Sequence, residues 1–184
     1  MSRISAISNE QATGKAKELL DSVQKKLGMT PNLMRTLAQS PAALEAYLNF
    51  NGTLGTTLNA KLREQLSLVT AEENGCGYCA SAHTAIGKMV GLSEAETLDA
   101  RAGKGNDAKT DAAVKFAKIV LAKRGKVSDE DLQAVRNAGF TEGEIAEIVA
   151  HIALNVFTNY FNNVAETEID FPVVELPLKP AANA

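Results

Sequence analysis

The sequence predicts an all-α protein, a single-domain bundle of many helices. Apolar residues recur at intervals of three and four along most of the chain, which is the period of an amphipathic helix. Capping residues and glycines divide the chain into segments of helical length, and no alternating run bounded by turns indicates a strand. With 184 residues, one domain accounts for the whole chain.

The composition excludes several classes of protein. A hydrophobic fraction of 45% and a charged fraction of 22% are typical of a globular chain and exclude a mostly disordered one. The balance of 19 basic against 22 acidic residues argues against a nucleic-acid partner. No apolar run approaches the roughly 18 residues of a membrane span, and no secretory signal is visible. We therefore expect a cytoplasmic protein with no membrane partner.

The first half of the chain predicts four helices. Ser8 and Gln11 form a capping box that starts the first helix, and Gly28 ends it. Two further helices begin where a capping side chain precedes a proline, at residues 30–31 and 40–41. Gly52 and Gly55 break the third helix. The fourth helix begins at Asn59 and ends at Asn74 and Gly75.

In the second half, a helix starts at the cysteine pair 76–79 and ends before Gly91. Residues 101–110 contain two glycines and form the clearest loop, which we interpret as a candidate hinge. An apolar helical pattern follows over residues 113–121. Three helices start at a capping residue with acids in the first turn, namely Ser93 with Glu96, Ser128 with residues 129–131, and Thr141 with Glu144.

The last helix, from Thr141 to Ala165, is apolar nearly all round. Its broad apolar face consists of residues 145, 148, 149, 152, 156, 157, 160, 161 and 164. Prolines then make residues 171–184 an extended tail after a helical domain of residues 1–170. The apolar residues of the tail are Val173, Val174, Leu176 and Leu178. Because such a helix must be buried on several sides, we expect a homo-oligomer in which helix and tail contact a neighbouring subunit.

Both cysteines of the chain lie in the tetrapeptide 76–79, and His83 follows four residues later. On a helix, Cys76, Cys79 and His83 share one face, and the two cysteines lie within disulfide range. Cys76 is predicted in the first turn, where the helix dipole favours a thiolate. His83 lies one turn beyond Cys79 and can exchange a proton with it. The pattern predicts reversible thiol chemistry.

Other interpretations of the cysteine pair remain open. Two inert buried cysteines are one. A structural zinc site is another, for which His151 or a carboxylate would have to complete the ligands. A thioredoxin-type centre is excluded, because there a strand precedes the motif and here the preceding segment is helical. His151 is otherwise interpreted as a packed or interface histidine. Asn159, Asn162 and Asn163 are interpreted as polar capping or interface residues.

The spacing of Glu64, Cys76, Cys79 and His83, followed by the tripeptide at 91–93, resembles the alkylhydroperoxidase D (AhpD)-like branch of the carboxymuconolactone decarboxylase superfamily. Residues 155–162 and 167–172 are similar to the subgroup of peroxidase-related enzymes. The resemblance implies an all-helical AhpD-like fold, commonly oligomeric, that reduces peroxides with the cysteine pair.

The same resemblance implies roles for individual residues. Cys79 would attack the peroxide, and Cys76, the more exposed thiol, would resolve the product. His83 and Glu64 would form a proton relay. Tyr78, which stands where efficient peroxidases of the family often have a histidine, would be auxiliary. The expected protein is a thiol-dependent peroxidase that uses a peroxide and a dithiol or protein reductant, without metal or cofactor. The alternatives are a redox- or metal-responsive binding module without turnover, and a decarboxylase or lactone-processing enzyme. Decarboxylase relatives generally lack the cysteine pair.

Overall fold

The computed structural model describes residues 2–177, and within this range all regular secondary structure is helical. The all-α prediction is confirmed. The nine helices within residues 2–177 are α1 (Gly14–Leu27), α2 (Asn32–Leu37), α3 (Pro41–Leu54), α4 (Ala60–Glu73), α5 (Gly77–Met89), α6 (Glu94–Arg101), α7 (Ala108–Lys123), α8 (Asp129–Asn137) and α9 (Glu142–Ala165). None of the helices in the described range is long and apolar enough to cross a membrane.

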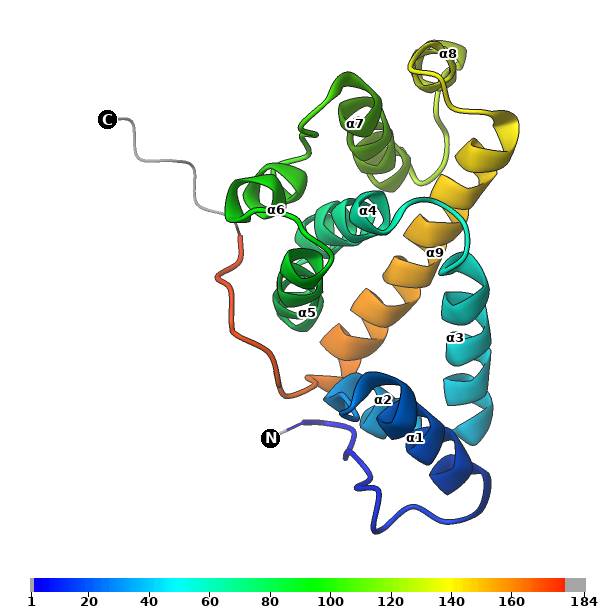
Figure 1. Cartoon of the computed structure of the whole chain (residues 1–184), viewed down its shortest axis with the longest axis vertical. Helices are drawn as coiled ribbons and strands as arrows, with labels where there is room; N and C mark the ends of the chain where they lie inside the picture. Colours follow the sequence, from blue (N-terminus) through cyan, green and yellow to red (C-terminus); the bar gives the residue numbers. More distant parts are fainter. Residues whose placement is uncertain (1, 178–184) are drawn as a thin grey trace.

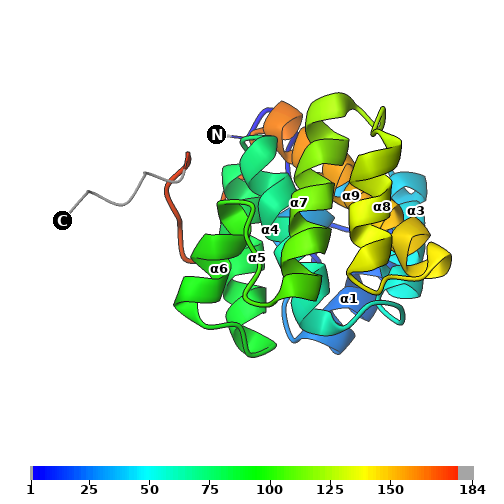
Figure 2. The same cartoon turned by 90° about the horizontal axis from the view of Figure 1, so that it is seen from above.

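Helix α4 lies at the centre of the bundle, in contact with α5, α6, α7 and α9 (Figure 1). Helix α9 crosses the molecule from α8 at one end to α2 at the other, and the view from above shows it between α7 and α3 (Figure 2). One apolar cluster joins α1, α2 and α3 to the start of α5. A second joins α4, α7, α8 and the first half of α9. The cysteine pair belongs to the first cluster.

Most helix starts agree with the capping residues in the sequence. The capping side chains that accept the expected backbone N–H group are Ser40, Asn59, Ser93, Ser128 and Thr141. Helix α3 continues through Gly52 and ends at Leu54, so only Gly55 marks its end as predicted.

Two predicted starts near the N-terminus are wrong. The capping box of Ser8 and Gln11 forms, with both hydrogen bonds at 3.2 Å, but it closes a single turn. The helix itself begins at Gly14, whose φ of +53° places it in the left-handed region and separates it from that turn. Thr30 does not cap α2, because its hydroxyl donates a hydrogen bond to Gln24 of α1 instead.

The segment between α6 and α7 is anchored by close contacts. The buried guanidinium of Arg101 donates to the Glu72 carboxylate at 2.8 Å. Gly105 packs against the start of α7 so closely that a Cβ there would lie 2.2 Å from the backbone nitrogen of Asp111. Its N–H donates to the Asp111 carboxylate. These contacts argue against the predicted hinge.

The described part of the tail packs on its own chain. The Asp170 carboxylate accepts the backbone N–H of Asn32, and the backbone N–H of Val174 donates to Ser81 of α5. Figure 1 shows this segment beside α5 and α6. Phe171, Val174 and Leu176 pack against the first apolar cluster, so these side chains need no neighbouring subunit for their burial. Of the predicted tail residues, Leu178 lies outside the described range.

Helix α9 does not bury one broad apolar face as predicted. Its buried residues are Ile145, Ile148, His151, Ile152, Leu154, Asn155, Thr158, Asn159, Asn162 and Ala165. Its exposed large apolar residues are Val149, Phe157, Tyr160 and Val164. The second half of the helix thus buries a polar face, because that face lies against the cysteine pair and α4.

Candidate active site

The cysteine pair is placed by a tight connection between α4 and α5. Gly75, at φ +62°, provides the left-handed residue that ends α4, and Cys76 follows as the N-cap of α5. The Cys76 Sγ accepts the backbone N–H of Cys79 at 3.2 Å. The two cysteines form a disulfide with their Cα atoms 5.3 Å apart, which confirms that the spacing brings them within bonding range. Cys76 precedes the first turn, in which it was predicted to lie.

The two sulfurs have different surroundings. Cys79 lines a cavity of about 440 Å³, and Cys76 is not among the residues that line it. Both side chains are buried, with exposed fractions of 0% for Cys76 and 3% for Cys79. The prediction that Cys76 is the more exposed thiol is wrong, because the N-cap position is covered by the rest of the first apolar cluster.

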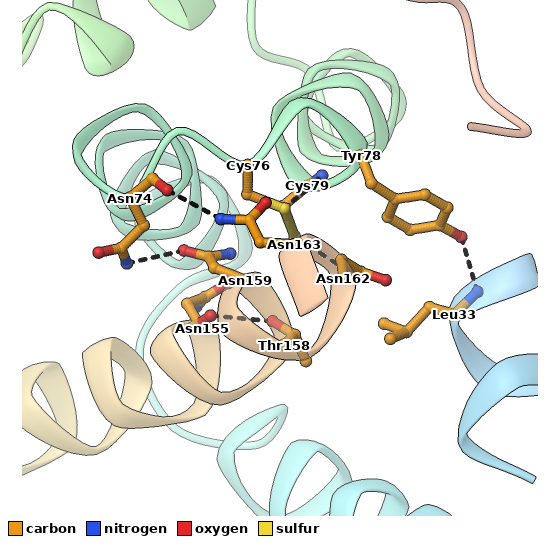
Figure 3. Close-up of a disulfide and its surroundings, with 10 residues drawn as sticks. All are labelled: Leu33, Asn74, Cys76, Tyr78, Cys79, Asn155, Thr158, Asn159, Asn162 and Asn163. Atoms are coloured by element: carbon orange, nitrogen blue, oxygen red, sulfur yellow. Dashed lines mark hydrogen bonds between the residues drawn. A yellow bond between two sulfur atoms is a disulfide. The ribbon is translucent and has the colours of Figure 1, made fainter. Parts of the chain in front are cut away.

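An asparagine from the last helix contacts Cys79 directly. The Nδ2–H of Asn162 donates to the Cys79 Sγ at 3.3 Å (Figure 3). Asn159 and Asn163 lie beside it, and both bond to Asn74 at the end of α4. A donor aimed at sulfur stabilises a thiolate more than a thiol, because hydrogen bonds to charged groups are the stronger ones. In the reduced protein, where Cys79 is no longer in the disulfide, a donor in this position would stabilise its thiolate.

Glu64 and His83 lie together, as the family resemblance implied. Helices α4 and α5 pack side by side after the tight connection, and the His83 Nδ1 lies 2.8 Å from the Glu64 Oε2. Both side chains are largely covered, with exposed fractions of 22% and 15%. His83, Glu64 and Cys79 all line the 440 Å³ cavity. No hydrogen bond between His83 and Cys79 occurs in the described chain, so a proton exchanged between them would cross the cavity through a water or a substrate.

Tyr78 forms a wall of the cavity. Its hydroxyl oxygen accepts the backbone N–H of Leu33 at 3.1 Å (Figure 3). Its ring forms a T-shaped pair with Phe171, with the ring centroids 5.9 Å apart. Burial, together with the charge of Asp170, raises the pKa of Tyr78 well above its usual range. Tyr78 therefore stays protonated and holds α2 and the tail over the cysteine pair.

His151 also lines the cavity, which the sequence did not indicate. Its side chain is buried, and its Nε2 lies 3.2 Å from the Thr57 hydroxyl. Burial and the nearby Arg63 charge lower its pKa, so the imidazole is neutral at neutral pH. The interpretation as a packed histidine is correct, but the packing is within the chain and at the site.

One sequence signal could have found the residues of α9. His151, Asn155, Thr158 and Asn162 follow one another at intervals of four, three and four, which places four polar side chains on one face of the helix. All four are buried, and three of them line the cavity. Among residues 2–177, no group of three or more His, Cys, Asp or Glu side chains is placed to hold a metal ion.

Comparisons with known proteins agree with this geometry. Residues 41–122 match the model of the carboxymuconolactone decarboxylase family. The structure is similar to that of an AhpD-core, uncharacterised peroxidase-related protein from Ralstonia eutropha JMP134, with 24% identity, 92% of each chain covered and a TM-score of 0.82. It is also similar to a peroxidase-related protein from Silicibacter sp. TM1040, with 21% identity over 90% of this chain and 91% of that one, and a TM-score of 0.78.

A third similar structure is that of the debrominase Bmp8, with 18% identity, 91% of each chain covered and a TM-score of 0.77. A cysteine-to-alanine variant of Bmp8, also similar to this chain, is known in complex with 2,3,4-tribromopyrrole. A search of curated proteins found no match. The fold of this chain is thus AhpD-like.

Proposed function

We propose that this chain is a thiol-dependent peroxidase. The match of residues 41–122 to the carboxymuconolactone decarboxylase family model and the AhpD-like fold support the proposal. The observation that carries the proposal is the convergence of Cys79, His83 and Glu64 on one cavity, with Cys76 bonded to Cys79 behind it. The proposal includes a cytoplasmic location, where thiols are kept reduced between turnovers.

The cycle begins with both thiols reduced. The Cys79 thiol gives its proton to His83, and the thiolate attacks one peroxide oxygen as the O–O bond breaks. The other oxygen takes this proton from His83 and leaves as an alcohol, or as water when the substrate is hydrogen peroxide. Cys79 is then a sulfenic acid. The Cys76 sulfur attacks the Cys79 sulfur, the Cys76 thiol proton joins the departing hydroxyl group as water, and the disulfide forms. An external dithiol supplies two electrons and two protons to restore both thiols. Glu64 holds His83 in position through its 2.8 Å contact.

Peroxide consumption by the reduced protein tests this proposal. The assay uses hydrogen peroxide and an organic hydroperoxide with a panel of small dithiols and dithiol proteins. We expect catalytic turnover with at least one reductant, and one disulfide per chain when reductant is withheld. Disulfide exchange without turnover would contradict the proposal and support a redox-responsive binding module. Lactone or decarboxylation turnover would favour the third interpretation.

The likeness to a debrominase supports a second candidate function at the same sulfur. The Cys79 thiolate would take the bromine from an electron-rich aromatic ring, and the ring carbon would take a proton. Cys76 would then displace bromide from Cys79 to form the same disulfide. The apolar wall residues of the cavity include Leu33, Met34, Ile86, Leu154 and Phe171, which suit an aromatic ring. Release of bromide from a bromopyrrole, in place of peroxide consumption, would favour this candidate.

The outer face of α9 supports the assembly of several copies of the chain. Its exposed residues at helical spacing are Ala146, Val149, Ala153, Phe157, Tyr160 and Val164. The exposed fractions of Tyr160 and Val164 are 58% and 62%. A continuous apolar stripe along a helix of 24 residues is typical of a protein interface. Light scattering at micromolar concentration tests this, and a mass near 19.5 kDa would contradict it.

A further inference from the structure

The cavity extends along α9, with the reactive sulfur at one end. Asn162 marks that end, since it bonds to Cys79, and Thr158, Asn155 and His151 follow along the same face. His151 lies eleven residues before Asn162, which corresponds to about 16 Å along the helix axis. There it meets Thr57 in the connection between α3 and α4. The cavity therefore has a far end that the thiol chemistry does not use.

A cation without an ion-pair partner lies at the far end. Arg63 of α4 lines the cavity and is half-buried, and its charge acts on His151. One of its N–H groups donates to the backbone carbonyl of Leu58. Within the described chain no carboxylate forms an ion pair with Arg63, whereas the buried Arg101 is paired with Glu72. A half-buried guanidinium in this setting has further N–H donors in the fixed planar arrangement of the group.

The other charged groups that line the cavity do not neutralise the positive charge of Arg63. Glu64 is the one carboxylate among the described lining residues, and it is held by His83 at 2.8 Å. His151 is neutral, because burial and Arg63 oppose its protonation. Lys26 adds a positive charge elsewhere in the cavity lining, from an exposed position. The far end is therefore electropositive, and a ligand group bound there gains most if it is an anion.

We propose that the cavity takes an organic substrate with an apolar body and an anionic group, and that Arg63 binds this anion while the reacting bond lies at Cys79. Leu33, Met34 and Tyr47 enclose the apolar body between the two ends. An anion bound by Arg63 fixes which end of the substrate meets the sulfur. This inference rests on the proposed thiol chemistry for the reacting end, but the anion site itself can be tested without turnover.

The test measures equilibrium binding of octanoate and octanol to the oxidised protein by calorimetry. The two probes share an apolar chain and differ in charge. We expect octanoate to bind about tenfold more tightly than octanol, which is the usual gain from a hydrogen-bonded charge pair. Equal affinities in the unmodified protein, or no binding of octanoate, would overturn the proposal without any variant being made.

Three variants then assign the effect to Arg63. Arg63→Gln keeps an N–H donor for the Leu58 carbonyl but removes the charge, and should abolish the preference for octanoate. Arg63→Lys keeps the charge and should retain part of the preference. Lys61→Met removes a positive charge from an exposed position on the same helix, outside the cavity, and should change nothing. A preference that survives in Arg63→Gln, or is lost equally in Lys61→Met, would overturn the assignment.

Turnover distinguishes this inference from the proposed function. With matched hydroperoxides that carry or lack a carboxylate, Arg63→Gln should raise KM for the charged one about tenfold and leave the uncharged one unchanged. If the protein consumes neither peroxide but still prefers octanoate through Arg63, the peroxidase proposal fails and the anion site stands. If both peroxides are consumed with equal KM and octanoate shows no preference, the anion site fails and the peroxidase proposal stands.

Discussion

Cys76 and Cys79 are three residues apart and joined by a disulfide, yet the fold gives them different surroundings. Cys76 is the N-cap of α5, and its sulfur is held by a backbone N–H of its own helix. Cys79 faces the cavity and accepts a hydrogen bond from Asn162, which is distant in the sequence. Local structure stabilises the Cys76 sulfur. Tertiary contacts stabilise the Cys79 sulfur and place it at the cavity, where a substrate can reach it.

This difference indicates that the two cysteines have different roles in the reaction. A sulfur that attacks a substrate must reach the cavity, and of the two cysteines only Cys79 lines it. A sulfur that resolves the product and later leaves as a thiolate needs a stabilised anion, which the N-terminus of α5 offers Cys76. From the helix dipole alone, Cys76 would be the nucleophile. Substitutions can test whether access to the cavity or the helix dipole determines which cysteine is the nucleophile.

Replacing each cysteine with serine has the largest expected effect. Cys79→Ser should abolish peroxide consumption, because the remaining thiol does not line the cavity. Cys76→Ser should permit one turnover and leave a sulfenic acid at Cys79. Mass spectrometry with a sulfenic-acid trap measures both. A trapped adduct on Cys76 in the Cys79→Ser protein, with activity retained, would reverse the two roles.

Substitutions in the proton relay should have the next largest effect on the reaction rate. Glu64→Gln and His83→Ala should each slow the attack step by about 10²–10⁴-fold, the usual contribution of a positioned acid–base group. Disulfide formation by a strong oxidant should remain. The rate of alkylation of Cys79 against pH, in a Cys76→Ser background, is the measurement. Glu94→Gln, on the exposed start of α6, is the control. Unchanged pH profiles in both relay variants would remove the support for the relay.

Asn162 should affect the two sulfurs unequally. Asn162→Leu removes the donor to Cys79 but not the backbone donor to Cys76. We expect alkylation of Cys79 to slow about tenfold at neutral pH, since hydrogen bonds to charged groups contribute about 1.5–3 kcal/mol. Cys76, measured in a Cys79→Ser background, should change little. Asn163→Leu, which loses only a bond to the Asn74 carbonyl, is the matched control. Equal slowing of both cysteines would indicate a general loss of packing instead.

The smallest expected effect is on the pH dependence of stability, through His151 at the far end of the cavity. Burial lowers the pKa of His151 from its ordinary 6.5, so the folded chain binds a proton there less readily than the unfolded chain. Stability should therefore fall as the pH drops below about 6.5, and His151→Gln should reduce this loss while it keeps a partner for Thr57. Urea unfolding between about pH 8 and pH 5 checks it. An identical pH slope in the variant would show that His151 does not contribute.

The sequence by itself determined the helices and the core of the reactive motif. Capping residues act on the backbone within three positions, so Asn59, Ser93 and Thr141 fix helix starts whatever packs around them. The pairing of Glu64 with His83 was expected only from the family resemblance, because spacing alone does not distinguish Glu64 from a solvated surface residue. The packing of α4 against α5 brings the two side chains together. Where a left-handed glycine intervened, as at Gly14, the same local rules placed a start too early.

Only the tertiary structure decided which sulfur meets the cavity and which face of α9 is buried. That helix is apolar on nearly all sides, so its hydrophobic pattern allows several orientations of similar burial. The choice came from polar contacts with distant residues, above all Asn162 with Cys79 and Asn159 with Asn74. These hydrogen bonds offset part of the cost of burying the asparagine amides, although the Asn159 Nδ2 and the Asn162 Oδ1 have no hydrogen-bond partner among the described residues. The asparagines face inward, and Phe157, Tyr160 and Val164 are left on the surface.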